Sequence, residues 1–232
     1  MEWTWLPYDA TPADYDAQAR ALLTAFRAGD AQAVERMYRH HPRFRRPDVS
    51  WLPGPMSAVE VAATTLDRDD ARLAVARAYD ALDWASLVAH AEAINTPHWD
   101  IARFEAAVEA VVRGDVDDLR RRLDEGPSLV RARSTRVGPF DPEVHWCTLL
   151  HYVAANGVEH WRQKTPPTAV AIADLLLARG ADPDALADLY GGECTTLTLL
   201  VSSRHPYEAG LQVPLVHMDA RASRAMNRRP ST

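Results

Sequence analysis

Histidine and cysteine side chains, which bind transition metals, gather between residues 145 and 160. The chain has nine histidines, and this segment contains His145, Cys147, His151 and His160. No two of these residues have the tight spacing of the motifs C-x-x-C or H-E-x-x-H. A site made from His145, Cys147 and His160 would require three loop residues to converge with the right geometry. We therefore expect no metal site and no cofactor.

A thiol nucleophile is the second chemistry that this segment offers. Cysteine catalysis needs a paired base, and His145 could serve Cys147, although nothing in the sequence fixes their geometry. Cys147 and Cys194 are the two cysteines of the chain. Two cysteines cannot form a disulfide scaffold, which indicates a reducing compartment. We expect two free thiols, a cytoplasmic protein and no catalytic residue.

A pair of glycines stands in the segment Tyr190-Gly191-Gly192-Glu193-Cys194, just before an expected helix. Backbone N–H groups at the start of a helix can bind a phosphate. The segment lacks the spacing and the lysine of a P-loop, and no expected strand precedes it. A tight turn is therefore the favoured interpretation.

Composition and charge argue against several classes of protein. The 232 residues suffice for one sizeable domain or two small ones, and 47% hydrophobic with 25% charged residues is the balance of a folded chain. A net charge of −6 argues against general nucleic-acid binding. No apolar run reaches the roughly 20 residues of a membrane span, and residues 1–5 lack the basic start of a signal peptide. We expect neither nucleic acid nor a membrane as a partner.

Two segments of the chain repeat one another. Gly29-Asp30 aligns with Gly114-Asp115, and a proline follows each pair at the same distance. Glycine tolerates the left-handed conformation that ends a helix, aspartate caps the next helix, and proline stops that second helix. Each segment therefore predicts two helices joined by a tight turn.

A second repeated pattern resembles the ankyrin family. Residues 148–157 are similar to the ankyrin pattern T-P-L-H-x-A-A-x-x-G, and residues 172–185 are similar to the second ankyrin helix with its Gly-Ala-Asp ending. Residues 195–201 open another such unit, with Thr198 at the histidine position. The chain thus resembles a bacterial ankyrin-repeat protein. The resemblance implies stacked helix pairs that bind a partner, and it implies that His151 braces a helix start through hydrogen bonds.

Three segments depart from a plain repeat. The two clear repeats start farther apart than the ankyrin period of about 33 residues, because residues 158–169 are inserted between the two helices of the first one. Residues 134–146 and 204–210 are also irregular. Insertions of this kind map to functional loops. Trp146 and Trp161 lie in them, either as interface anchors or as lids packed over short helices.

These patterns predict an all-α fold, an ankyrin-like solenoid of stacked helix pairs, with no convincing strand. We expect divergent helix pairs over residues 1–98, ankyrin-like repeats over 99–218 and an irregular basic tail over 219–232. The last expected helix lacks the leucines of the ankyrin pattern, so it would cover little apolar surface. This would leave three leucines partly uncovered, namely Leu197, Leu200 and Leu215.

The resemblance places a partner on the loops before each first helix and on the exposed side of those helices. Carried over position by position, these residues are Val144, His145, Cys147, Ala155, Asn156, Gly191, Gly192, Cys194, Ser202 and Ser203. We add Trp161 and Lys164 from the insertion, and Tyr190 and Glu193 beside the glycine pair. The expected function is non-catalytic binding of an unidentified protein partner. The alternative is a small-molecule or enzymatic site built from the insertions, with the residues His145, His160, Trp161, Tyr190 and Glu193.

Overall fold

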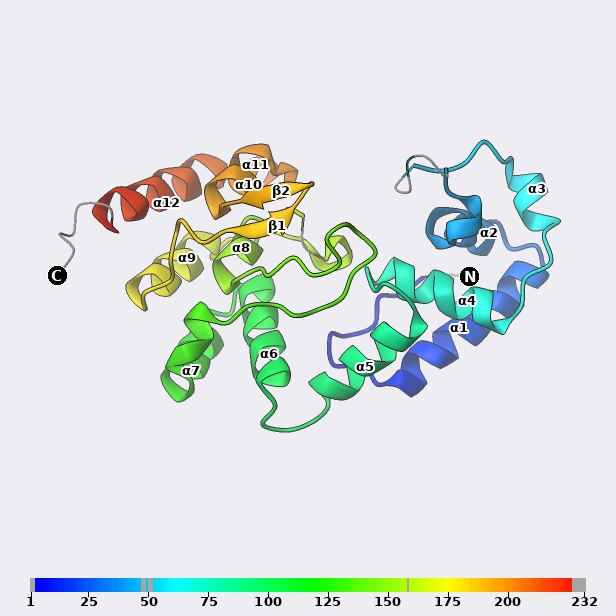
Figure 1. Cartoon of the computed structure of the whole chain (residues 1–232), viewed down its shortest axis with the longest axis horizontal. Coiled ribbons are helices and arrows are strands. Elements are labelled where there is room, and N and C mark those ends of the chain that lie inside the picture. The colour runs from blue at the N-terminus through cyan, green and yellow to red at the C-terminus, as the bar shows by residue number, and fades with distance from the viewer. Residues whose placement is uncertain (1–2, 47–48, 50–51, 158, 227–232) are drawn as a thin grey trace. The chain divides into compact units, whose positions relative to one another are not determined.

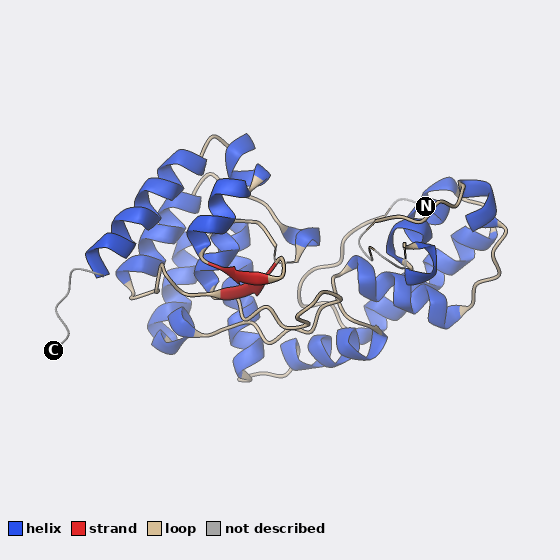
Figure 2. Cartoon of the chain, turned by 45° about the horizontal axis from the view of Figure 1, so that its top comes forward, coloured by secondary structure: helices blue, strands red, loops and turns tan. Residues whose placement is uncertain are grey.

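The computed structural model of the chain describes residues 3–46, 49, 52–157 and 159–226. The described chain is mostly helical, with one short two-stranded sheet, as Figures 1 and 2 show. The expected all-α class is confirmed at this level. Two compact units divide the chain. The N-terminal unit comprises Met1–Asn95 with Val137–Pro139, and the C-terminal unit comprises Thr96–Arg136 with Phe140–Thr232.

Local capping fixes the helix ends of the N-terminal unit. Thr11 and Asp14 form a reciprocal capping box at the start of the first helix. The expected turn is present, because Gly29 is left-handed (φ 75°) and Asp30 accepts the N–H of Ala33 at 2.9 Å. The elements of this unit are α1 (Pro12–Arg27), α2 (Ala31–His40), the 3-10 helix η1 (Pro42–Phe44), α3 (Ala58–Ala62), α4 (Arg68–Ala78) and α5 (Trp84–Ile94).

Tyr79 is the centre of an aromatic cluster in the N-terminal unit. Its buried ring lies edge-on to Trp5, with 5.2 Å between the ring centroids. Its hydroxyl accepts the N–H of Leu6 at 2.8 Å, and the guanidinium of Arg36 stacks 4.4 Å from the centre of the Trp3 ring. The first described residues are thereby packed against the helices of this unit.

The C-terminal unit consists of successive helices interrupted by one hairpin. Its elements are α6 (Asp100–Arg113), α7 (Val116–Glu125), η2 (Pro127–Arg131), α8 (Leu149–Val153), η3 (His160–Arg162), α9 (Ala169–Ala178), β1 (Ala187–Leu189), β2 (Gly192–Cys194), α10 (Thr196–Ser202), α11 (Arg204–Glu208) and α12 (Gln212–Met226). Gly114 (φ 74°) and Asp115 form the second expected turn, and Asp115 accepts the N–H of Asp118 at 2.9 Å.

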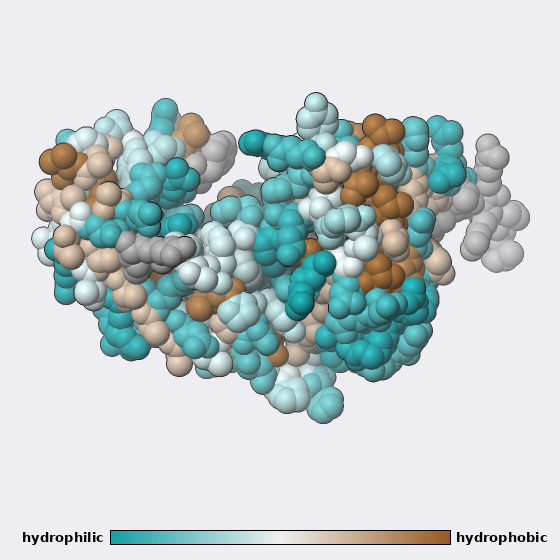
Figure 3. Space-filling view, turned by 180° about the vertical axis from the view of Figure 1, so that it is seen from behind, coloured by the Kyte–Doolittle hydropathy of each residue, from teal (hydrophilic) through white to brown (hydrophobic). Residues whose placement is uncertain are grey.

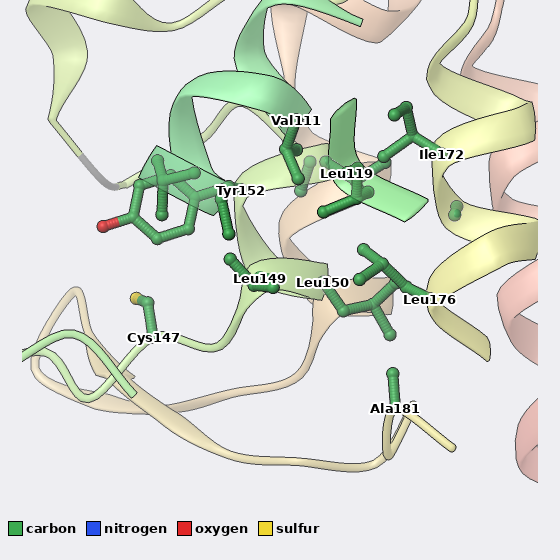
Figure 4. Close-up of a cluster of buried hydrophobic side chains, with 14 of the residues drawn as sticks. Val111, Leu119, Cys147, Leu149, Leu150, Tyr152, Ile172, Leu176 and Ala181 are labelled. Atoms are coloured by element: carbon green, nitrogen blue, oxygen red, sulfur yellow. The ribbon is translucent and has the colours of Figure 1, made fainter. Parts of the chain in front are cut away.

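Two layers of helices enclose the core of the C-terminal unit. α8 packs against α6 and α10 in one layer, while α9 packs against α7 and α12 in the other. Figure 4 shows the core between the layers, where Leu119, Leu150 and Leu176 lie together and each is at most 2% exposed. Every pair of helices therefore contributes one apolar face to a continuous core.

A β-hairpin replaces the strand-free loop that the sequence predicts. β1 and β2 are antiparallel and pair Ala187 with Cys194, Asp188 with Glu193, and Leu189 with Gly192. Tyr190 and Gly191 connect them, and both have positive φ (56° and 76°), as a type I′ turn requires. The expected tight turn at the glycine pair is thus present. Strands of three residues are too short to show the alternation by which sequence reveals a strand.

The end of the helical layers is covered, contrary to the sequence prediction. Residues 219–226 continue α12 instead of forming an irregular tail, while 227–232 lie outside the described residues. Leu215, Met218 and the half-buried Ala222 follow one another at helical spacing on the face that packs on α9 and α10. Leu200 and Leu215 are therefore fully buried and not uncovered, and only Leu197 is partly exposed.

The outer surface of these last helices keeps some apolar character. Figure 3 shows hydrophobic side chains gathered on one face of the C-terminal unit, beside a largely hydrophilic surface. The large apolar side chains that α10, α11 and α12 expose are Val201, Tyr207 and Val213. They are separate from the buried leucines, so the core itself is closed at this end.

Asp219 offers a test of how α12 is held. It is 3% exposed, and burial, together with the charge of Asp184, raises its pKa to about 6. A carboxyl whose pKa is higher in the folded state makes the fold less stable as pH rises from about 4 to about 6. Asp219→Asn should remove this loss and raise the free energy of unfolding at pH 8 by on the order of 1 kcal/mol, after allowance for solvent screening.

Urea unfolding of the full chain at pH 4 and pH 8 measures this effect. The control is Asp174→Asn, which removes an exposed carboxylate from α9 and should change the free energy of unfolding by less than about 0.5 kcal/mol. An unaltered pH dependence in Asp219→Asn would contradict the assignment.

Candidate functional site

His151 connects the start of α8 to the segment just before β1 and to the end of β2. Its Nδ1 accepts the N–H of Thr148 at 3.1 Å, and its Nε2 donates to the carbonyls of Ala185 (3.1 Å) and Cys194 (3.3 Å). The ring is completely buried, and burial lowers its pKa to about 4. The imidazole is therefore neutral at pH 7, and its expected bracing role is confirmed.

Asn156 makes a second link between neighbouring elements. Its Nδ2 donates to the carbonyl of Leu199 and to Oγ of Ser202, both at 2.9 Å. Its Oδ1 accepts the hydroxyl of Tyr190 at 2.6 Å. Asn156 thus fixes the end of α8, the helix α10 and the tip of the hairpin relative to one another.

Three of the residues assigned to partner binding from the sequence lie in the interior. Cys147 is completely buried, while Ala155 and Ser203 are each 3% exposed, and Ser203 Oγ donates to the carbonyl of Ala155 at 3.1 Å. These side chains cannot contact a partner, because the adjoining loops and helices cover them. Of the other assigned residues, Val144, His145, Asn156, Trp161 and Cys194 are half-buried, while Lys164, Tyr190, Gly191, Gly192, Glu193 and Ser202 are exposed.

The loop before α8 runs beside the hairpin. The N–H of Asp188 donates to the carbonyl of His145 at 2.9 Å. The Nη1 group of Arg133 donates to the carbonyls of Trp146 (2.7 Å) and Leu186 (2.6 Å). The Arg133 guanidinium therefore links the loop before α8 to the segment before β1, and it keeps the backbones of Trp146 and Leu186 close together.

Outward-pointing residues of this region form what we call the finger face. Along β1, the buried Ala187 and Leu189 alternate with residues whose side chains lie on the outer side of the hairpin. The large apolar side chains that this region exposes are 42% to 73% accessible. The finger face comprises Trp146, Leu186, Asp188, Tyr190 and Glu193. Of these, Leu186 and Asp188 are missing from the sequence-based assignment, and Trp146 enters the sequence analysis only as either an interface anchor or a packed lid.

Two aromatic residues of the finger face have unfavourable backbone conformations. Trp146 (φ 54°) and Tyr190 (φ 56°) are left-handed, and they are 44% and 73% exposed. A left-handed residue with a Cβ costs roughly 1–2 kcal/mol. Because both rings are exposed, packing within the chain offsets little of this cost. The type I′ turn and the hydroxyl bond to Asn156 maintain this conformation in Tyr190, and the bond from Arg133 maintains it in Trp146.

The insertion enters the core through a cluster of buried charges. Arg162 Nη2 lies 2.6 Å from Glu105 Oε2, and Arg162 Nε lies 2.5 Å from Glu159 Oε2. Arg136 lies 3.6 Å from the same Glu159 carboxylate, which also accepts the hydroxyl of Tyr152 at 2.7 Å. All of these groups are buried or nearly so, which makes the charges depend on one another.

Burial and neighbouring charges affect the two carboxylates of this cluster in opposite directions. Burial raises the pKa of Glu105, and Arg162 opposes this only in part. Burial also acts to raise the pKa of Glu159, but Arg162 and Arg136 outweigh it and lower that pKa. The cluster is therefore held together by two arginines, one of which the insertion supplies. A signal for it exists in the sequence, because Glu105 interrupts an apolar helix face beside Phe104 and Val108.

The far end of the insertion packs on the turn between α6 and α7. Thr168 Oγ1 donates to the carbonyl of Gly114 at 2.6 Å. A Cβ at Gly114 would lie 2.6 Å from Cβ of Pro166, so this position requires glycine both for its positive φ and for the close approach. Trp161 is half-buried, with the Arg162 guanidinium 5.4 Å from its ring centre. For Trp161 these contacts favour the packing interpretation over an interface anchor.

The chemistry considered from the sequence finds little support in this geometry. Cys147 and Cys194 are both free, and burial raises the pKa of the inaccessible Cys147 thiol, so it is a poor nucleophile. No group of three or more histidine, cysteine or acidic side chains that could hold a metal ion occurs among the described residues. His160 and Lys164 are exposed.

Comparison with known proteins assigns no relative to the chain. No family model, no curated protein and no solved structure matches it. Among the described helices, none has the length and apolar character that crossing a bilayer requires.

The charge cluster predicts that the insertion contributes to stability. Arg162→Met leaves Glu105, which is 1% exposed, without its main partner. Breaking a buried ion pair on one side costs about 3–5 kcal/mol. We expect the free energy of unfolding in urea to fall by that amount. We also expect deletion of residues 161–167 to unfold the C-terminal unit, since the deletion removes Arg162.

The matched control is Arg120→Met, which breaks an exposed ion pair with Asp117 on α7. This change should lower the free energy of unfolding by less than about 1 kcal/mol. Equal decreases in the free energy of unfolding for Arg162→Met and Arg120→Met would show that the buried cluster contributes no more to stability than an exposed ion pair.

Proposed function

We propose that the C-terminal unit is an ankyrin-like stack that binds a protein partner in the cytoplasm through the finger face. The ankyrin-like character is supported by the Thr148–His151 brace, by the helix pairs in two layers and by a hairpin that precedes α10. Each of these features joins one repeat-like unit to the next. Stacks of this type display their loops on a rigid scaffold, which suits them to recognition.

The exposed, strained pair Trp146 and Tyr190 is the observation on which this proposal rests. Aromatic side chains are the commonest anchors of protein interfaces. Both rings project from loops that hydrogen bonds fix in place, through Arg133 for Trp146 and through Asn156 for Tyr190. A partner would gain large apolar contact areas at a small cost in conformational entropy. Leu186 extends this apolar surface.

Photo-crosslinking tests the proposal and identifies the partner. The full chain, with benzoylphenylalanine in place of Tyr190, is irradiated in a lysate of its host, and crosslinked proteins are identified by mass spectrometry. The same reagent in place of Tyr207, an exposed tyrosine on α11, is the control. A protein crosslinked from position 190 and not from position 207 is expected. Identical products at both positions, or none, would contradict the proposal.

Substitution of the anchors should separate binding from stability. Tyr190→Asn places a residue favoured in type I′ turns at the left-handed position, so the free energy of unfolding should stay constant or rise by up to about 1 kcal/mol. Affinity for the crosslinked partner, measured by calorimetry, should fall at least tenfold, and Trp146→Ser should have a similar effect. Tyr207→Asn should leave the affinity unchanged. Unchanged affinity for the partner in both finger-face variants would contradict the proposal.

A further inference from the structure

Two carboxylates stand directly opposite each other on the finger face. Asp188 of β1 pairs with Glu193 of β2, and the two-residue turn makes this a pair without mutual backbone hydrogen bonds. Cβ atoms in such pairs lie about 4.5–5.5 Å apart, and like charges at this distance repel. The hairpin has only three residues in each strand, so this repulsion falls on a marginal element.

No basic side chain in the described part of the chain neutralises this pair. Neither carboxylate has an ion pair or a side-chain hydrogen bond there. Arg133, the arginine that reaches the hairpin, directs its Nη1 to two backbone carbonyls. Two more acidic residues, Asp141 and Glu143, are exposed in the loop that leads to Trp146. The finger face therefore combines apolar rings with two carboxylates that form no ion pair in the described part of the chain.

The outer edge of β2 offers backbone N–H and C=O groups for hydrogen bonds with another strand. In a pair of this type the backbone N–H and C=O groups point away from the partner strand, and the N–H of Asp188 indeed reaches the carbonyl of His145 on the outer side of β1. The corresponding groups of Glu193 point away from the hairpin, and Glu193 is exposed. An extended segment of another chain could pair with them.

We propose that the finger face binds an extended, basic segment of the partner protein. An arginine or lysine of this segment would lie between Asp188 and Glu193, and an apolar neighbour would lie against Trp146, Leu186 and Tyr190. A guanidinium suits the position best, because it pairs with carboxylates through two hydrogen bonds and stacks on aromatic rings. This inference rests on the proposed function and specifies the partner's chemistry.

The carboxylates of the finger face also disfavour other classes of ligand. Nucleic acids and anionic membranes carry the same sign of charge as this face and would be repelled. A calcium ion needs six to eight oxygen ligands, and the paired carboxylates cannot supply that number. A basic peptide satisfies the charge, the apolar surface and the free strand edge together.

The experiment measures the affinity of the full chain for the crosslinked partner after charge reversal. Asp188→Lys with Glu193→Lys should lower the affinity at least a hundredfold, and Asp188→Asn with Glu193→Gln about tenfold, with a weaker dependence on salt between 50 and 300 mM. The control carries the same change in net charge elsewhere, as Asp117→Lys with Asp174→Lys on α7 and α9, and should bind within twofold of the unaltered chain. Circular dichroism and thermal melting should show that the neutralised variant folds normally.

The sequence of the crosslinked segment gives an independent readout. Tandem mass spectrometry should find arginine or lysine within about four residues of the crosslink, the reach of an extended segment on this face. A neutral or acidic segment, or full affinity in the charge-reversal variant, would overturn this inference. If those results occur while Tyr190→Asn and Trp146→Ser still abolish binding, the proposed function stands and only the inference of a basic partner segment fails. If none of these substitutions alters binding, the proposed function fails as well.

Discussion

The buried imidazole of His151 is the interaction on which the C-terminal unit depends. α8 has five residues, which is too few for a helix that is stable by itself, and its start is held by the bond from Thr148 to Nδ1. The opposite ring nitrogen bonds carbonyls at both ends of the hairpin segment, Ala185 and Cys194. One neutral ring therefore fixes a helix start and a hairpin together. Desolvation, which holds its pKa near 4, keeps the ring uncharged at neutral pH.

Charge, more than apolar surface, positions the long insertion. Arg162 inserts between Glu105 and Glu159 and offsets part of the cost of burying each carboxylate, while Arg136 gives Glu159 a second cationic neighbour. A buried ion pair adds little net stability over well-packed apolar residues, but removal of one partner is strongly unfavourable. The insertion therefore has one favourable position, against α6 and α8. A segment that resembles a binding loop in the sequence is in large part a structural element.

Hydrogen bonds of Arg133 and Asn156 shape the finger face. Its two aromatic residues adopt conformations that a free loop would avoid, and such conformations persist only where the surroundings determine them. Arg133 supplies this restraint for Trp146, and Asn156 supplies it for Tyr190. These hydrogen bonds hold the surface in one arrangement, which would lower the entropy lost on binding the partner that we propose.

The sequence by itself determined the local features: the Gly114-Asp115 turn, the contact between Thr148 and His151, and the helical class. These depend on residues within a few positions of one another, and hydrogen-bonding chemistry at that range is visible in the residue types. Only the tertiary structure decided that Arg162 meets Glu105, 57 residues away. The same holds for Ala155, which the resemblance placed on the surface and which the structure buries, with its carbonyl accepting the hydroxyl of Ser203. Burial and long-range pairing depend on which segments pack together, and a single sequence does not encode that choice locally.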